Sequence, residues 1–213
     1  MGKEDKLIMV VGKNDLFGED HFEGFRSPES VDFNSRILKN FRYLRRKEAE
    51  ENPEYKQPIG YCAILNPNRK QVFAYQRSSE DLTYFERRLQ GKWSWGLGGH
   101  IEKIDENGRD PILASLLREL KEEVEVEITG SPKLIGYIND EHNDVGKVHF
   151  GILYVLETRR DDIRPRDMEI MQGRFTTVPE LEEICSSPEF SVEDWSRISL
   201  PPLKNYLQVR GPH

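Results

Sequence analysis

The spacing of hydrophobic residues predicts one strongly amphipathic helix near the middle of the chain. The helix begins at Asp110-Pro111, because aspartate is a favoured N-cap and proline suits the first helical position. Its apolar residues recur at helical spacing, at Leu113, Leu116, Leu117, Leu120 and Val124. We therefore expect one face of this helix to pack against a core.

Short apolar runs on both sides of that helix predict strands. Runs at 59–65 and 71–77 flank the turn-forming segment Asn66-Pro67-Asn68-Arg69, which predicts a hairpin. Further strands are expected at 7–11, 133–138 and 147–157, and residues 93–101 are expected to form a short strand that enters a glycine turn. Helices are expected at 35–51, 179–184 and 191–199. Strands interleaved with helices in this order predict an α/β (α+β) sandwich with a mixed β-sheet between helices.

The chain length of 213 residues is enough for one well-buried domain with some chain to spare. We expect the main domain to cover residues 58–213. Residues 1–57 would then be an N-terminal strand and helix extension packed on that domain. Because the extension carries apolar residues that the main domain does not need, we also expect a two-fold homodimer.

The amino-acid composition indicates which partners and which cellular compartment to expect. The net charge of −7 disfavours a surface that coats nucleic acid, so no nucleic-acid partner is expected. The two cysteines, Cys62 and Cys185, imply no disulfide framework. No apolar run approaches the ~18 residues of a spanning helix, and the charged N-terminus does not resemble a signal peptide. These features predict a cytoplasmic protein without a membrane segment.

Three carboxylates lie beside the apolar stripe of the central helix. At about 100° per residue, Glu119, Glu122 and Glu123 fall within about a third of a turn of one another. Like charges at this spacing repel, and the repulsion grows where the dielectric is low. Oxygen ligands favour hard cations, so the cluster predicts a site for Mg²⁺ or Mn²⁺. The alternative is a solvated charged face, but the glycine turn and the capped helix before it favour a site.

The residues around these carboxylates resemble the signature of the Nudix (MutT-like) hydrolases, G-x₅-E-x₇-R-E-U-x-E-E-x-G-U, where U is a bulky aliphatic residue. The second half is similar to the segment Arg118-Glu119-Leu120-Lys121-Glu122-Glu123-Val124-Glu125-Val126, and the opening to Gly98-Gly99-His100-Ile101-Glu102. There are three departures: an insertion within Lys103–Arg109, Asp110 in place of the first glutamate, and Glu125 in place of the late glycine. The three helix carboxylates stay in register.

The resemblance implies a metal-dependent hydrolase that cleaves a diphosphate linkage, such as that of a nucleoside diphosphate derivative. Glu119, Glu122 and Glu123 would bind the metal together with the backbone carbonyl of Gly99. Arg118 would orient the acids through a charge-assisted hydrogen bond. The metal would activate a water molecule that attacks phosphorus, as in other metal-dependent phosphoryl-transfer enzymes.

The general base and the substrate contacts are less sharply indicated. Relatives often place a catalytic glutamate between a late strand and the C-terminal helix, where Glu169 lies; Glu122 is the competing base, and Glu123 also belongs to the catalytic set. Arg77 and Arg88 could contact phosphates, although a solvated surface position is the alternative for Arg88. Trp95 could stack on a substrate ring, and core packing is its alternative.

Two other functions share the fold. One is a Nudix-like nucleotide-binding or regulatory module without hydrolysis, which the complete Glu-x-x-Glu-Glu set disfavours. The other is an enzyme similar to isopentenyl-diphosphate isomerase, which needs a cysteine and a glutamate together. Cys62 lies in a strand beside Tyr61 and Ala63, which indicates a buried apolar role. The substrate itself cannot be deduced from fold-level resemblance.

Overall fold

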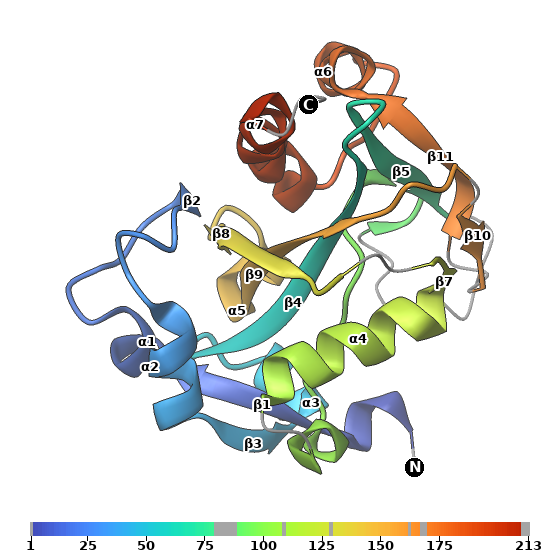
Figure 1. Cartoon of the computed structure of the whole chain (residues 1–213). Coiled ribbons are helices and arrows are strands. Elements are labelled where there is room, and N and C mark those ends of the chain that lie inside the picture. Colours follow the sequence, from blue (N-terminus) through green and yellow to red (C-terminus); the bar gives the residue numbers. More distant parts are fainter. Residues whose placement is uncertain are drawn as a thin grey trace. The chain divides into compact units, whose positions relative to one another are not determined.

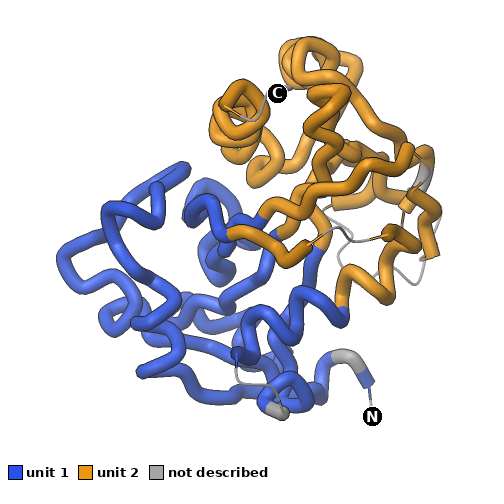
Figure 2. Tube along the Cα trace, in the orientation of Figure 1, with its two compact units in different colours: residues 1–61, 98–118, 134–154 blue, residues 62–97, 119–133, 155–213 orange. Residues whose placement is uncertain are grey.

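The computed structural model describes residues 2–78, 89–107, 110–127, 130–161, 163–166 and 170–209. The chain forms two compact units (Figure 2). Unit 1 comprises residues 1–61, 98–118 and 134–154, and unit 2 comprises residues 62–97, 119–133 and 155–213. Strands and helices follow one another along the chain, and many of the strands belong to one large sheet (Figure 1). The predicted α/β fold is therefore confirmed.

Unit 1 contains the N-terminal segment and the turn that precedes the central helix. Its elements are η1 (Lys3–Asp5), β1 (Leu7–Gly12), α1 (Lys13–Phe17), β2 (Gly24–Arg26), α2 (Phe33–Asn40), β3 (Arg42–Arg45), α3 (Arg46–Glu50), η3 (Lys103–Asn107) and α5 (Asp144–Val148). β1 pairs antiparallel with β3 and with the start of β4 (Tyr55–Asn66), and β2 pairs with β8 (Lys133–Asn139).

An aromatic cluster forms much of the unit 1 core. The rings of Phe17, Phe22, Phe33 and Phe150 lie 5.3–6.3 Å apart between centroids. Such edge-to-face pairs stabilise a core beyond the area that they bury. Because three of these four rings come from residues 1–57, the N-terminal segment is part of the core of unit 1.

Unit 2 contains the hairpin and the C-terminal helices. Its elements are β5 (Gln71–Arg77), β6 (Trp93–Ser94), β7 (Val124–Glu125), β10 (Arg164–Pro165), β11 (Ile170–Thr177), α6 (Val178–Ser186) and α7 (Asp194–Val209). β5 pairs antiparallel with β11, β6 and the end of β4. Four elements contribute residues to both units: β4, α4 (Pro111–Glu123), β8 and β9 (His149–Glu157).

Most predicted elements are confirmed, and residues 35–51 are the main correction. The hairpin, the strand at 7–11 and the capped helix are all present. The predicted polar helix is instead α2, β3 and α3, because β3 forms antiparallel hydrogen bonds with β1, with Leu44 opposite Ile8. Tertiary pairing thus overrides the helical propensity of this basic segment. The strand predicted from residue 147 begins at His149, since α5 occupies the preceding residues.

Candidate functional site

The glycine turn before α4 lies directly against β4 within unit 1. A Cβ atom on Gly98 would lie 1.9 Å from the carbonyl oxygen of Gly60, so no other residue fits there. The φ angle of Gly98 is 152°, which side chains also disfavour. A β-bridge between Ile59 and His100 continues this contact. These contacts hold the glycine turn, which includes Gly99, in a fixed position against β4.

Asp110 caps α4 as the sequence predicts. Its Oδ1 atom accepts hydrogen bonds from the backbone N–H groups of Ile112 (3.0 Å) and Leu113 (3.2 Å). The buried face of α4 includes Ile112, Leu116 and Leu120, each at most 1% exposed. Leu113 and Leu117 of the predicted stripe are only half-buried, so the buried face is turned toward Ile112. This one-sided burial sets the rotation of the helix about its axis.

Counting back seven residues from Arg118, as in the family signature, would make Asp110 its partner. In the structure Arg118 instead pairs with Asp105. Its Nε and Nη2 atoms donate to the Asp105 carboxylate at 2.9 and 3.0 Å, and Nη2 also donates to the His100 carbonyl at 3.1 Å. Asp105 is buried, and it also accepts a hydrogen bond from the Glu102 backbone. Two parallel bonds of this kind are strong and directional. Arg118 therefore ties α4 to the turn that follows Gly99.

This pairing corrects the assignment of the first acidic position. In the signature five residues separate the glycine from the first acid, and five residues after Gly99 are followed by Asp105, the acid that pairs with Arg118. Asp110 is the helix cap and has a separate role. The extra residues therefore fall between Asp105 and Asp110. Sequence reasoning missed Asp105 because it counted back from Arg118; counting forward from Gly99 finds it.

The three glutamates lie on the last turns of α4, in unit 2. Glu119 and Glu123 are half-buried and Glu122 is exposed. Arg166 holds the end of this helix: its backbone N–H donates to the Glu123 carbonyl at 2.8 Å, and its Nη1 donates to the Lys121 carbonyl at 3.1 Å. Arg166 was not singled out from the sequence, because its role depends on a strand pairing distant in the chain.

The strand that follows α4 explains the replacement of the late glycine. Glu125 lies in β7, opposite Arg164 of β10. Among the described residues other than glycine, only Lys70 and Gln172 have positive φ angles. The backbone at Glu125 is therefore one that any residue adopts, and glycine is not required there.

The predicted substrate-binding residues of unit 2 take part in a buried network. Arg77 forms an ion pair with Glu193, which also accepts a hydrogen bond from Ser94 at 3.0 Å. Trp95 is 1% exposed, and its indole N–H donates to Ser199 at 3.0 Å. These contacts favour the packing alternative for Trp95 over stacking on a substrate. Arg88 and Glu169 lie outside the described residues.

Both cysteines lie in surroundings that disfavour thiolate formation. Burial raises the pKa of the Cys62 thiol well above its usual range, with Glu123 adding to the effect. Burial also raises the pKa of Cys185. Since the thiolate is the reactive form, this disfavours the isomerase-like alternative.

Comparisons with known proteins decide the family. The NUDIX domain family model matches residues 56–195. Protein YmaB of Bacillus subtilis (strain 168) is 33% identical over 192 residues, which span 86% of this chain and 91% of YmaB. This chain belongs to the Nudix family. The family match makes it a pyrophosphohydrolase, that is, an enzyme acting on phosphorus anhydrides.

Solved structures agree with that assignment. The crystal structure of Tm1382, classed with the Nudix hydrolases, superposes with a TM-score of 0.75 at 27% identity over 94% of this chain and 100% of Tm1382. The Nudix domain of Shewanella oneidensis NrtR, solved with ADP-ribose, gives a TM-score of 0.53 at 13% identity, covering 71% of this chain and 88% of that one. The latter shows a shared fold alone. None of the helices in the described residues is long and apolar enough to cross a membrane.

Proposed function

We propose that this Nudix enzyme hydrolyses the diphosphate linkage of a nucleoside diphosphate derivative, using carboxylates of α4 to hold a divalent metal. The observation that carries the proposal is the complete Arg-Glu-x-x-Glu-Glu set on one capped helix, which the Arg118–Asp105 pair ties to the segment after the glycine turn. A solvated face would need neither the pairing nor the turn.

The donor set fits Mg²⁺ or Mn²⁺. Glu119, Glu122 and Glu123 offer only carboxylate oxygens, which hard divalent cations prefer. When bound, such an ion would neutralise the diphosphate and lower the pKa of the attacking water molecule. Glu119 and Glu123 are half-buried, so their carboxylates are more restricted in direction than that of the exposed Glu122. Gly99 as a further ligand follows from the family resemblance.

Arg118 acts as a positioning residue in this proposal. Its guanidinium is occupied by Asp105 and by the His100 carbonyl, one residue after Gly99. It therefore orients the glycine turn relative to its own helix. The general base is Glu169 or Glu122. An E169Q variant that loses the acidic limb of the pH–rate profile, while E122Q keeps it, would assign the role to Glu169.

The metal-binding chemistry and one relative both favour nucleoside diphosphate derivatives as substrates. A metal held by carboxylates suits a phosphorus anhydride, and the Nudix domain of NrtR was solved with ADP-ribose, a nucleoside diphosphate sugar. The test is a panel of nucleoside diphosphate sugars, dinucleoside polyphosphates, NADH, CoA, nucleoside triphosphates and non-nucleotide diphosphates, read by phosphate-releasing coupled assays. We expect turnover of the first group to exceed that of the others. Equal, negligible turnover of all nucleotides would overturn the substrate class.

Metal dependence has its own test. Treatment with EDTA should abolish turnover, and added Mg²⁺ or Mn²⁺ should restore it. Full turnover of the chelated enzyme would rule out the role given to the α4 carboxylates.

A cytoplasmic location also remains part of this proposal.

A further inference from the structure

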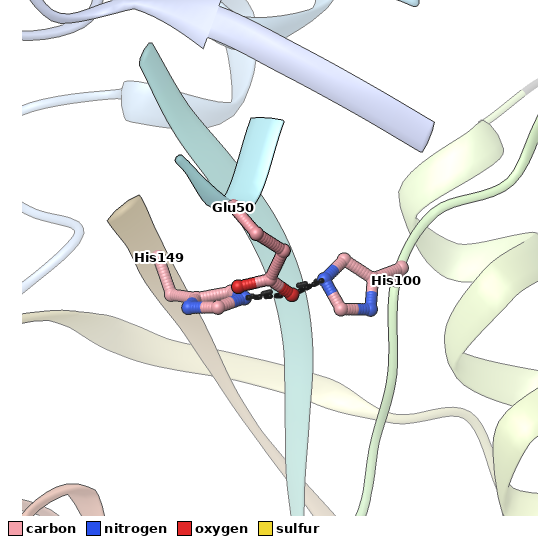
Figure 3. Close-up of side chains that lie close together, drawn as sticks. All are labelled: Glu50, His100 and His149. Carbon is pink, nitrogen blue, oxygen red and sulfur yellow. Dashed lines mark hydrogen bonds and ion pairs between the residues drawn. The ribbon is translucent and has the colours of Figure 1, made fainter. Parts of the chain in front are cut away.

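A second group of metal-binding side chains lies within unit 1 and is not part of the α4 cluster. Glu50 ends α3, His100 follows the glycine turn, and His149 is the first residue of β9. These three residues are far apart in the sequence, yet their side chains point toward one another (Figure 3). Their potential ligand atoms all lie within 4.8 Å of one another.

The three ligand atoms form a nearly regular triangle. The two Nε2 atoms of His100 and His149 are 3.2 Å apart, and Glu50 Oε1 lies 3.6 Å from His100 Nε2 and 3.8 Å from His149 Nε2. In a tetrahedral site with bonds of about 2.0–2.1 Å, two ligand atoms are separated by roughly 3.4 Å. Shifts of a few tenths of an ångström would therefore place all three atoms at bonding distance from one ion. His100 Nε2 also donates a hydrogen bond to Gln57 Oε1 at 2.7 Å, so this proton would have to move to Nδ1 when an ion binds.

His149 makes a hydrogen bond of the kind that is typical of metal-binding histidines. Its Nδ1 atom lies 2.7 Å from the Val145 carbonyl oxygen, so the proton sits on Nδ1 and Nε2 faces the triangle. Metal-binding histidines commonly donate the other ring N–H to a carbonyl in this way. The side chains of His149, His100 and Glu50 are only 7%, 13% and 15% exposed, so few water molecules compete for them.

Glu50 contributes one buried carboxylate to the triangle, and a positive charge lies beside it. Glu50 Oε1 is buried and accepts no hydrogen bond from the described residues, although Arg46 Nε lies 3.4 Å away as an ion-pair partner. Arg46 is the neighbouring charge that would oppose an ion at the site.

We propose that Glu50, His100 and His149 bind a divalent transition metal ion of the zinc class. Two imidazoles and a carboxylate favour zinc over Mg²⁺, whereas the all-carboxylate set of α4 has the opposite preference. The ion joins α3, the glycine turn and the start of β9, and it stabilises unit 1 because the unfolded chain lacks the assembled site. This proposal does not depend on the diphosphate substrate.

Two other groups of His, Asp and Glu side chains in unit 1 provide a control for this site. His142 forms a group with Glu23 and Asp140, but its side chain is 83% exposed and bonded to Asp140 at 2.8 Å. His21 forms another group with Glu23 and Glu141, whose carboxylate is paired with Lys13 and Lys56. Exposed or already paired ligands bind an ion weakly, so H142Q should leave zinc binding unchanged.

The experiment uses the full-length protein, treated with EDTA and returned to excess Mg²⁺. Zn²⁺ is titrated against a chromophoric chelator, and Co²⁺ is added separately to record the visible bands of four-coordinate cobalt. We expect one zinc ion per chain at this site, and a melting temperature raised by about 5–10 °C at free zinc a hundredfold above Kd. Loss of a hydrogen-bond partner of a ligand costs 10–100-fold in affinity, so E50Q and H149Q should each weaken binding by at least about 100-fold.

The remaining variants separate this site from the α4 cluster. The E119Q/E123Q double variant should bind zinc as the wild type does, because it retains all three ligands. If that variant loses zinc binding, the ion lies in the α4 cluster, and the proposed function stands while this inference fails. Absence of a zinc-dependent melting shift in the wild type, or equal affinity in wild type and E50Q, also overturns it. If circular dichroism shows that H149Q does not fold, the zinc affinity of E50Q alone is the test of the site.

Discussion

Asp105 and Asp110 lie five residues apart and have different partners. Asp105 is buried and pairs with Arg118 through two hydrogen bonds, while Asp110 accepts two backbone hydrogen bonds at the start of α4. Asparagine can replace a helix cap, because its side-chain oxygen accepts the same bonds. It cannot replace the charge that Arg118 requires. The same substitution should therefore affect the two sites unequally.

We expect D105N to lower the free energy of unfolding by about 2 kcal/mol, the scale of a charge-assisted hydrogen bond whose buried partner is lost. D110N should change it by less than about 0.5 kcal/mol. Urea unfolding of both variants measures the difference. If the two substitutions cost the same, Arg118 does not depend on Asp105.

The α4 carboxylates make a second residue-scale prediction. E119Q and E123Q keep the side-chain size but remove a charge that a hard cation needs, so turnover should fall at least ~10²-fold. Stability should change little, or rise, because like-charge repulsion decreases. Steady-state turnover with Mg²⁺ and a melting curve test each variant. D110N is the matched control; a larger loss of turnover there than in E123Q would show that the site is on other residues.

At the scale of elements, a buried lysine joins three parts of unit 1. Lys56 of β4 is fully buried, donates to the Gly146 carbonyl of α5 at 2.7 Å, and lies 3.1 Å from the Glu141 carboxylate. Lys13 of α1 contacts the same carboxylate at 3.1 Å. Burial lowers the pKa of Lys56 to about 8, in spite of its carboxylate partner. The pairing therefore compensates only part of the cost of burying this ammonium group.

The pH dependence of stability follows from Glu141. Although burial opposes the shift, hydrogen bonds and charges from Lys13 and Lys56 lower its pKa from 4.5 to about 2. A carboxyl group with a lowered folded-state pKa stabilises the fold above pH 4.5 and loses that effect as the pH falls toward 2. We expect E141Q to be less stable than wild type at pH 7 and to lose less of its stability between pH 4.5 and 2. Chemical unfolding across that range measures it; parallel curves would contradict the assignment.

At the scale of the whole molecule, the N-terminal segment bears on self-association. Its apolar residues motivated the expectation of a homodimer, and Ile8, Val10, Phe33 and Ile37 are each at most 1% exposed. These four side chains are therefore already buried within unit 1, whereas Leu7 and Leu38 of the same segment are 40% and 37% exposed. The homodimer remains a prediction that rests on the frequency of two-fold symmetry.

Light scattering at micromolar concentration tests the homodimer directly. A dimer would give twice the chain mass of 24.9 kDa. The measurement should be made with and without Mg²⁺ and Zn²⁺, so that metal-dependent association is recognised. A single species at the chain mass under all conditions would contradict the prediction.

The sequence by itself determined the features that depend on local pattern. The cap at Asp110, the stripe of α4, the hairpin and the spacing of Glu119, Glu122 and Glu123 all arise within a few residues of chain. Their physical causes, backbone capping and helical periodicity, act over the same short distance. The family resemblance rests on these local features.

Only the tertiary structure decided the features that join distant segments. Residues 42–45 are helical by composition, but they form β3 because β1 supplies hydrogen bonds from more than thirty residues away. Glu50, His100 and His149 come together only after the chain has folded. Each of these contacts depends on long-range packing, which no local pattern encodes, because the gain from a contact must exceed the entropy of closing the intervening loop.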